Sequence, residues 1–216
     1  VRAVYFVPSD RVHSLDQDWR AILDDHLEKL VKFHDLQFRG LSRINWLVYP
    51  EPIIGKETSS GYPTDIFGGE TVAGIEKIVP ELEERLGLMP QSGGANTKQN
   101  NGISWQSFQT DEKMYRVILI LYEGAGASGK EGAALLSRAL LADHARSAFA
   151  TTFLAHEFYH ALGAPDRYRA AAETVEDGTL IPRAHELLET QDVMGLVEVP
   201  IERATLDQET LRAFGL

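Results

Sequence analysis

Apolar residues in the first half of the chain follow two spacings, one typical of helices and one typical of buried strands. Spacings of three and four predict helices over about 16–38 and over Glu70–Leu86. Short apolar runs predict strands at Val4–Val7, Ile44–Tyr49 and Val117–Tyr122. The last run is apolar at successive positions, so we expect it in the centre of a sheet that is covered on both faces. This alternation of strands and helices indicates an α/β (α+β) fold with a mixed sheet.

The segments between and after these elements have a different composition. Residues 55–68 and 87–104 are rich in glycine and small polar residues, which predicts loops. The glycine-rich residues 124–132 predict a flexible surface link, and residues 133–141 fit either a helix or an edge strand. A further helix is predicted over about 147–162.

Composition and charge narrow the class of protein. The chain has 216 residues, 44% of them hydrophobic and 25% charged, which is typical of a globular protein with one core, so residues 1–216 are interpreted as a single domain. The net charge of −11 disfavours nucleic acid as a partner. The chain has no cysteine, and it contains no apolar run of about 18 residues that predicts a membrane span.

One stretch, residues 156–166 (H-E-F-Y-H-A-L-G-A-P-D), carries the candidate chemistry. Side chains four residues apart lie on one face of a helix, so His156 and His160 can direct imidazole nitrogens at one metal ion. Glu157 lies beside the first histidine, where its carboxylate can reach a metal-bound water without binding the metal. Ser147 is a candidate cap for this helix. The pattern H-E-x-x-H is the working core of zinc metallopeptidases.

The residues after the second histidine supply a candidate third ligand. Gly163 suits a helix end at which the chain turns in a left-handed conformation, and Pro165 prevents the helix from resuming. Asp166 comes three residues after this glycine, so the turned chain can bring its carboxylate beside the two histidines. Three protein ligands with one open position are typical of a catalytic zinc site rather than a structural one.

The pattern H-E-x-x-H-x-x-G-x-x-D, followed downstream by Asp192-Val193-Met194-Gly195, resembles the metzincin clan of zinc metallopeptidases. Most metzincins carry a third histidine where this chain has Asp166. The aspartate is similar to that of snapalysin, and the run from Gly163 to Tyr168 is similar to the immune-inhibitor-A type of bacterial protease. The resemblance covers about residues 147–166 and, more weakly, 192–195.

The resemblance implies a metzincin-like fold of two lobes. The upper lobe, about residues 1–163, would hold a twisted mixed sheet and the active-site helix. The smaller lower lobe, about residues 164–216, would be irregular and would end in a C-terminal helix, which apolar spacing predicts over Thr205–Phe214. Met194 would pack under the zinc ligands as a hydrophobic floor, and an edge strand within 133–141 would pair with the substrate backbone.

Two further features of the family's sites can be sought in this sequence. Some metzincins place a tyrosine shortly after the methionine turn, but no tyrosine follows Met194, and the directions of Tyr159 and Tyr168 are open. The specificity pocket of such enzymes is shaped by the segment after the turn, here Gly195–Pro200, whose apolar residues favour an apolar substrate side chain.

Other residues could provide the third ligand or another chemistry. Glu186 and Glu189 would be the choice in a thermolysin-like peptidase, although the glycine, aspartate and methionine favour Asp166. His144 and His185 are weaker candidates because of their positions in the sequence. His26 and His34, on the first predicted helix, have no acidic residue or histidine at i+4 and are interpreted as structural.

A second pattern, Gly124–Glu131, matches the phosphate-binding G-x-x-x-x-G-K. Glu131 stands where a serine or threonine would hold magnesium, so this segment is interpreted as a surface loop and not as a nucleotide site.

The hypothesis is therefore a zinc-dependent endopeptidase with one catalytic Zn²⁺ and Glu157 as the general base; the alternative is a zinc-containing domain that binds peptide without cleaving it. A Ca²⁺ site is conceivable in the acidic loops, but no EF-hand pattern supports it. We expect a peptide or protein substrate, no membrane or nucleic-acid partner, and a monomer. A secreted bacterial protein is slightly favoured, although no signal peptide is present in the sequence.

Overall fold

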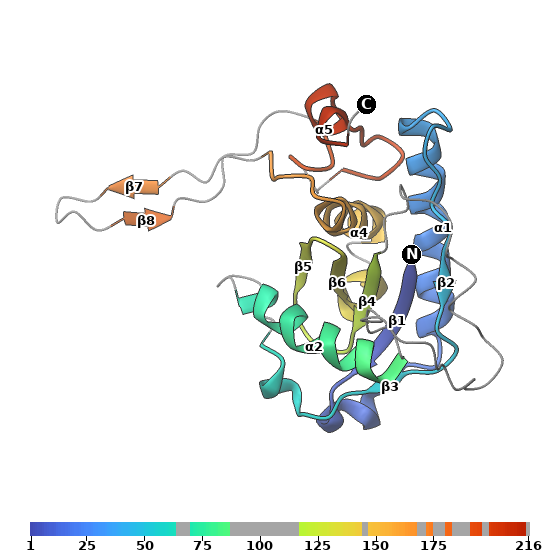
Figure 1. Cartoon of the computed structure of the whole chain (residues 1–216), viewed down its shortest axis with the longest axis vertical. Coiled ribbons are helices and arrows are strands. Elements are labelled where there is room, and N and C mark those ends of the chain that lie inside the picture. The colour runs from blue at the N-terminus through green and yellow to red at the C-terminus, as the bar shows by residue number, and fades with distance from the viewer. Residues whose placement is uncertain are drawn as a thin grey trace, which may run out of the picture.

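The computed structural model describes residues 1–63, 70–86, 117–143, 147–167, 172–174, 180–182, 191–195 and 199–214. These residues form a mixed α/β fold around a six-stranded sheet (Figure 1). Its strand order is β2-β1-β4-β6-β5. Strand β3 is not on this path and pairs with the C-terminal end of β1, whereas β2 pairs with its N-terminal end. All pairs are parallel except β5–β6, which is antiparallel.

The six strands of the sheet are β1 (Arg2–Val7), β2 (Leu47–Val48), β3 (Ile53–Ile54), β4 (Ile118–Tyr122), β5 (Ala127–Lys130) and β6 (Ala133–Ser137). The helices are α1 (Trp19–Gln37), α2 (Glu70–Leu86), α3 (Arg138–Ala142), α4 (Ser147–Ala161) and α5 (Gln208–Ala213), with 3-10 helices at Ser9–Ser14 and Ser59–Gly61. A separate antiparallel pair consists of β7 (Ala172–Thr174) and β8 (Leu180–Pro182).

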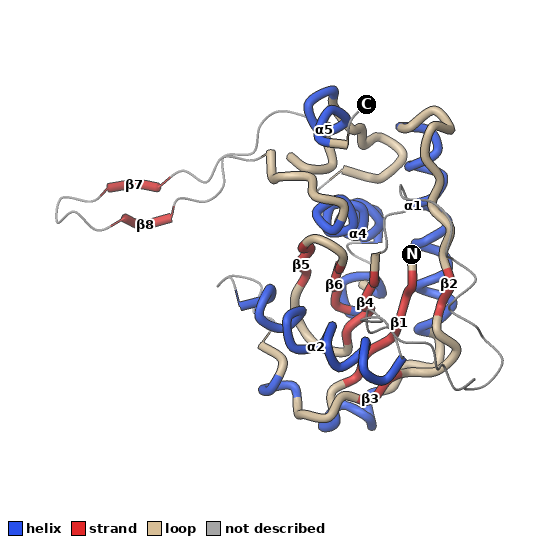
Figure 2. The backbone as a smooth tube through the Cα atoms, viewed as in Figure 1, coloured by secondary structure: helices blue, strands red, loops and turns tan. Residues whose placement is uncertain are grey.

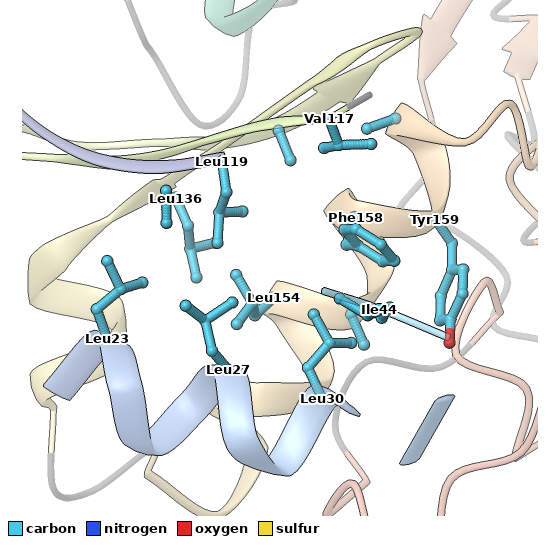
Figure 3. Close-up of a cluster of buried hydrophobic side chains, with 14 of the residues drawn as sticks. Leu23, Leu27, Leu30, Ile44, Val117, Leu119, Leu136, Leu154, Phe158 and Tyr159 are labelled. Carbon is cyan, nitrogen blue, oxygen red and sulfur yellow. The ribbon is translucent and has the colours of Figure 1, made fainter. Parts of the chain in front are cut away.

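Side chains alternate between the two faces of the central strands, and each face has its own core. Tyr5 of β1, Leu119 of β4 and Leu136 of β6 belong to a cluster with α1 and α4. Figure 3 shows part of this cluster, where Leu23, Leu27 and Leu30 of α1 point toward the sheet and α4. The neighbouring strand residues belong to a second cluster that contains the buried face of α2. The apolar run Ile118–Tyr122 thus serves two cores, as expected for a central strand.

Several predicted elements are confirmed. Helix α2 spans Glu70–Leu86 as predicted, and β4 lies between β1 and β6. Helix α1 begins at Trp19 instead of about residue 16, because Asp16 accepts a hydrogen bond from the backbone N–H of Asp18 (2.8 Å) in the turn that precedes the helix.

The strand predicted at Ile44–Tyr49 is wrong in its bounds. Only Leu47–Val48 pair with β1, and a second short strand, Ile53–Ile54, pairs with β1 further along. Pro50 and Pro52 lie between them and have no backbone N–H to donate, which explains why the pairing is interrupted.

The predictions for 124–132 and 133–141 need the largest correction. The glycine-rich segment is not merely a surface link, because Ala127–Lys130 form β5, the last strand of the described sheet on that side. Residues 133–141 contain both β6 and most of α3, and β6 lies inside the sheet between β4 and β5. The edge strand is therefore β5 and not the segment predicted.

The chain beyond α4 has little regular structure where it is described (Figure 2). The C-terminal helix α5 is shorter than the predicted Thr205–Phe214, because the side chain of Asp207 accepts a hydrogen bond from Thr210 N and begins the helix there. Among the described residues, none of the helices is long and apolar enough to cross a membrane. The loop predicted at 87–104 and residues 64–68 of the loop predicted at 55–68 lie outside the described residues.

Candidate metal centre

Helix α4 holds the H-E-x-x-H motif against the interior of the protein. It packs on α1, β5 and β6, and most of its residues are buried. Its C-terminal end follows the prediction: Gly163 has φ of +96°, Gly163 N donates to His160 O (2.9 Å) and Ala164 N donates to Tyr159 O (3.0 Å). These two bonds are the usual way in which a left-handed glycine closes a helix.

The turn after Gly163 returns the chain to the same face of α4. Asp166 Oδ1 lies 3.0 Å from His160 Nε2 and 3.3 Å from His156 Nε2. The two Nε2 atoms are 3.0 Å apart. The structure thus brings together the three residues that the sequence predicted as ligands, and among the described residues they form the one group with such spacing.

The spacing of these three atoms fits a divalent cation. Ligands at about 2.0–2.1 Å in a tetrahedral zinc site lie about 3.3 Å from one another. The three separations here, 3.0, 3.0 and 3.3 Å, are close to that value. Two imidazole nitrogens and one carboxylate oxygen are also a donor set that zinc accepts. The residues therefore fit a zinc ion.

Backbone carbonyls orient both imidazoles. His156 Nδ1 lies 2.9 Å from Val193 O, and His160 Nδ1 lies 2.8 Å from Ala164 O. A carbonyl only accepts hydrogen bonds, so each Nδ1 donates to its carbonyl, and Nε2 is the nitrogen that faces Asp166. Metal-binding histidines typically have this arrangement, in which the nitrogen that does not bind the metal donates to a carbonyl or carboxylate.

The close contact of Asp166 with the two imidazoles shifts the pKa values of Asp166 and His160. Burial raises the pKa of Asp166, but hydrogen bonds from His156 and His160 outweigh burial and hold that pKa well below its ordinary value. Burial lowers the pKa of His160, but the hydrogen bond and charge of Asp166 reverse this and raise it.

Glu157 is buried beside this group, with 8% of its surface exposed. Burial raises the pKa of its carboxyl group, while His156, His160 and the backbone of Gly129 act in the opposite direction. A carboxyl group with a raised pKa is a stronger base than an exposed one, which is what proton transfer near neutral pH requires.

Asp192–Gly195, the segment that the resemblance implies as a methionine turn, forms a turn in the structure. Gly195 N donates to Asp192 O (2.9 Å), and Met194 is fully buried in the same apolar cluster as α4. Val193 O of this turn lies 2.9 Å from Nδ1 of the candidate ligand His156, and Met194 O accepts a hydrogen bond from the N–H of Arg167 (2.8 Å), the residue after Asp166.

Gly129 of β5 also shapes the site, because it lies against Glu157 and His160, and the sequence did not single it out. A Cβ atom at this position would lie 2.2 Å from Glu157 O and 2.5 Å from His160 Cβ, so only glycine allows β5 to approach α4 this closely. The hairpin turn after β5 also contacts the helix, since Gly132 N donates to Ala161 O (2.9 Å). The richness in glycine was a visible signal, but it does not distinguish a close approach from a loop.

Other candidates from the sequence lie elsewhere. Tyr159 is fully buried in the apolar cluster of which Figure 3 shows part, and its hydroxyl lies 3.2 Å from His34 Nδ1. The remaining candidates, His144, Tyr168, His185, Glu186 and Glu189, lie outside the described residues, as do Leu196 and Val197 of the predicted pocket segment.

In comparisons with known proteins, no protein family matches this chain and no curated protein is similar to it.

Proposed function

We propose that this protein is a zinc-dependent endopeptidase of the metzincin type. The observation that carries the proposal is the convergence of His156 Nε2, His160 Nε2 and Asp166 Oδ1 at zinc-ligand spacing, with the buried carboxyl group of Glu157 beside them. A purely structural zinc site has no use for an additional buried carboxyl group that does not bind the metal.

The residues have distinct roles in the proposed reaction. Zinc in such a site supplies Lewis acidity, which makes water a nucleophile near neutral pH. His156, His160 and Asp166 hold the ion. Glu157 accepts the proton of the attacking water and donates it to the leaving amine, which completes peptide hydrolysis with balanced protons.

The edge strand β5 offers a place for an extended substrate. Ser137 N donates to Gly126 O (2.8 Å), so these two residues are a hydrogen-bonded pair. Such pairs alternate with non-hydrogen-bonded pairs along an antiparallel ladder. Ala127 and Gly129, one and three positions after Gly126, therefore direct their N–H and C=O groups away from β6.

A peptide that pairs with this edge would lie next to the metal site, because the same strand contacts Glu157 and His160. The backbone N–H of Gly129 interacts with the carboxyl group of Glu157, which leaves the N–H of Ala127 and the carbonyl groups of Ala127 and Gly129 for pairing with a peptide. Addition of a strand to an exposed sheet edge is a common mode of peptide recognition. This placement supports an endopeptidase that binds an extended chain.

The test is a peptidase assay on a mixed peptide library, run with zinc, with a chelator, and with Glu157→Gln. Glutamine keeps the shape of the side chain but cannot accept the proton. We expect cleavage that the chelator abolishes and that the variant lacks while retaining zinc. If the wild-type protein binds zinc but cleaves no peptide in the library, the proposed peptidase is contradicted. Cleavage that persists in Glu157→Gln would contradict the mechanism.

A further inference from the structure

The three candidate ligands differ in how the fold holds them. His156 and His160 lie one turn apart on the buried helix α4. Asp166 lies on a stretch without regular secondary structure, and its side chain is 42% exposed. Its position therefore depends on whatever fixes the chain immediately around it.

The residue that follows Asp166 makes contacts in two directions. The backbone N–H of Arg167 donates to Met194 O (2.8 Å), which fixes the main chain beside the third ligand. Its guanidinium group forms ion pairs with Asp207 (3.1 Å to Oδ2) and with Glu209 at the start of α5. A planar guanidinium can hold two carboxylates in a fixed geometry.

The methionine turn and α5 are also joined directly, through the buried carboxylate of Asp192. This carboxylate accepts hydrogen bonds from Met194 N (2.6 Å), from Thr210 Oγ1 (3.1 Å) and from the backbone N–H of Asp207. The contacts of Asp192 and Arg167 form a closed ring that runs from Asp166 to the methionine turn, to the start of α5 and back.

We propose that Arg167 is a positioning residue through which the C-terminal helix α5 sets the metal affinity of the site. It does not bind the metal. It holds Asp166 in place by joining the methionine turn on one side to α5 on the other. Loss of the guanidinium group leaves the backbone contact with Met194 but releases the chain from α5, so Asp166 spends less time in the position that binds the metal. The inference rests on the proposed zinc site but not on peptidase activity.

The experiment measures the zinc dissociation constant by competition with a chromophoric chelator. Arg167→Met keeps the length of the aliphatic side chain and removes the charge. We expect it to raise the zinc Kd by about 10–100-fold, the usual effect of changing a residue that orients a metal ligand. Arg167→Lys keeps the positive charge but loses the planar guanidinium that can bond to two carboxylates, and it should give an intermediate Kd. Arg212→Met is the matched control, because it removes an exposed arginine from α5. It should leave the zinc Kd unchanged.

A second measurement separates positioning from general destabilisation. In an Asp166→Ala background the third ligand is gone, so Arg167→Met should cause no further rise in the zinc Kd. An equal rise in both backgrounds would show that Arg167 acts on the fold as a whole and would overturn the proposal. A wild-type Kd in Arg167→Met would overturn it as well.

Arg167→Met could also fail to fold. Glu209→Gln covers that case, because Glu209 is 61% exposed and its loss removes only one of the two partners of Arg167. We expect a smaller rise in Kd that disappears in the Asp166→Ala background, and an unchanged Kd in this folded variant would contradict the proposal. Because only metal binding is measured, absence of peptidase activity would count against the proposed function and leave this inference intact.

Discussion

Helices α1 and α4 pack against each other and each carries two histidines, but among these only His156 and His160 of α4 form a candidate metal site. On α4, His156 and His160 bond to backbone carbonyls through Nδ1 and face Asp166 with Nε2. On α1, His26 and His34 use both ring nitrogens for bonds within the core. The second pair is therefore structural.

The partners of the α1 histidines show why. His26 Nε2 lies 3.2 Å from Leu141 O and its Nδ1 lies 2.8 Å from Thr151 Oγ1. His34 lies between the hydroxyl groups of Tyr159 and Ser42. Neither pair of partners includes a carboxylate. Burial alone thus does not identify a histidine that can bind metal. One ring nitrogen must be held by a hydrogen bond, and the other must face a second group that can bind the same ion.

The largest expected effect is the loss of a ligand from α4. Removing His160 should raise the zinc Kd by more than about 100-fold, because changes to residues that only orient the ligands already cost about 10–100-fold. The matched variant on α1, His34→Ala, removes a histidine that is at least as buried and should leave the zinc Kd unchanged in the folded protein. Equal zinc affinity in His160→Ala and wild type would remove the distinction between the two helices.

The next effect concerns the acidic residue that follows a histidine on each helix. Glu157 follows His156 and is buried, whereas Asp35 follows His34 and is exposed. Glu157→Ala should lower kcat by about 10²–10⁴-fold, the usual contribution of a general base, and leave bound zinc unchanged. Asp35→Ala should change neither quantity. Elemental analysis of the same samples used for kinetics measures both.

The third prediction compares glycines near the two helices. Gly129→Ala places a methyl group against the backbone of α4 and should lower the free energy of unfolding by about 1–3 kcal/mol and reduce activity. Gly40, just beyond α1, has φ of +75°, and no atom lies within 4 Å of the position that a methyl group would take there. Gly40→Ala should therefore cost about 1 kcal/mol through its backbone conformation and leave activity unchanged. Urea unfolding and a peptidase assay on both variants provide the comparison.

The smallest effect is the pH dependence of stability that His34 contributes. Burial lowers the pKa of His34 to about 4, although the charge of Asp35 opposes this. The unfolded chain, with an ordinary histidine pKa near 6.5, takes up a proton first, so stability should fall as the pH drops from about 6.5 toward 4.

At pH 5, allowing for screening by solvent, we expect this contribution to be about 1 kcal/mol. His34→Phe should reduce the difference in unfolding free energy between pH 7 and pH 5 by that amount, while the contributions of other groups cancel in the comparison. An unchanged difference would mean that His34 is not held neutral in the folded protein.

The sequence predicted the residues of the candidate site because the motif depends on side chains at fixed spacings. His156, His160, Gly163 and Asp166 each follow from helix periodicity or from the needs of a helix end. The strand β4 and the helix α2 were predictable for a similar reason, since a continuous apolar run and a three-four spacing are local signals.

The parts that could not be predicted depend on tertiary contacts. Ala127–Lys130 has a glycine and a serine where strands favour β-branched residues, and it becomes β5 because it pairs with β6 and packs on α4. The carbonyls of Val193 and Ala164 orient the imidazoles, but every residue has a carbonyl, so no residue type marks them. The ion pairs of Arg167 with α5 join segments 40 residues apart, and no local pattern reveals them.

The most direct test of the central claim is a crystal structure of the zinc-saturated protein with diffraction data collected on both sides of the zinc absorption edge. We predict one anomalous peak at about 2.0–2.2 Å from Nε2 of His156, Nε2 of His160 and a carboxylate oxygen of Asp166. No peak at that position, or a zinc ion bound by other residues while these three side chains point elsewhere, would contradict the account.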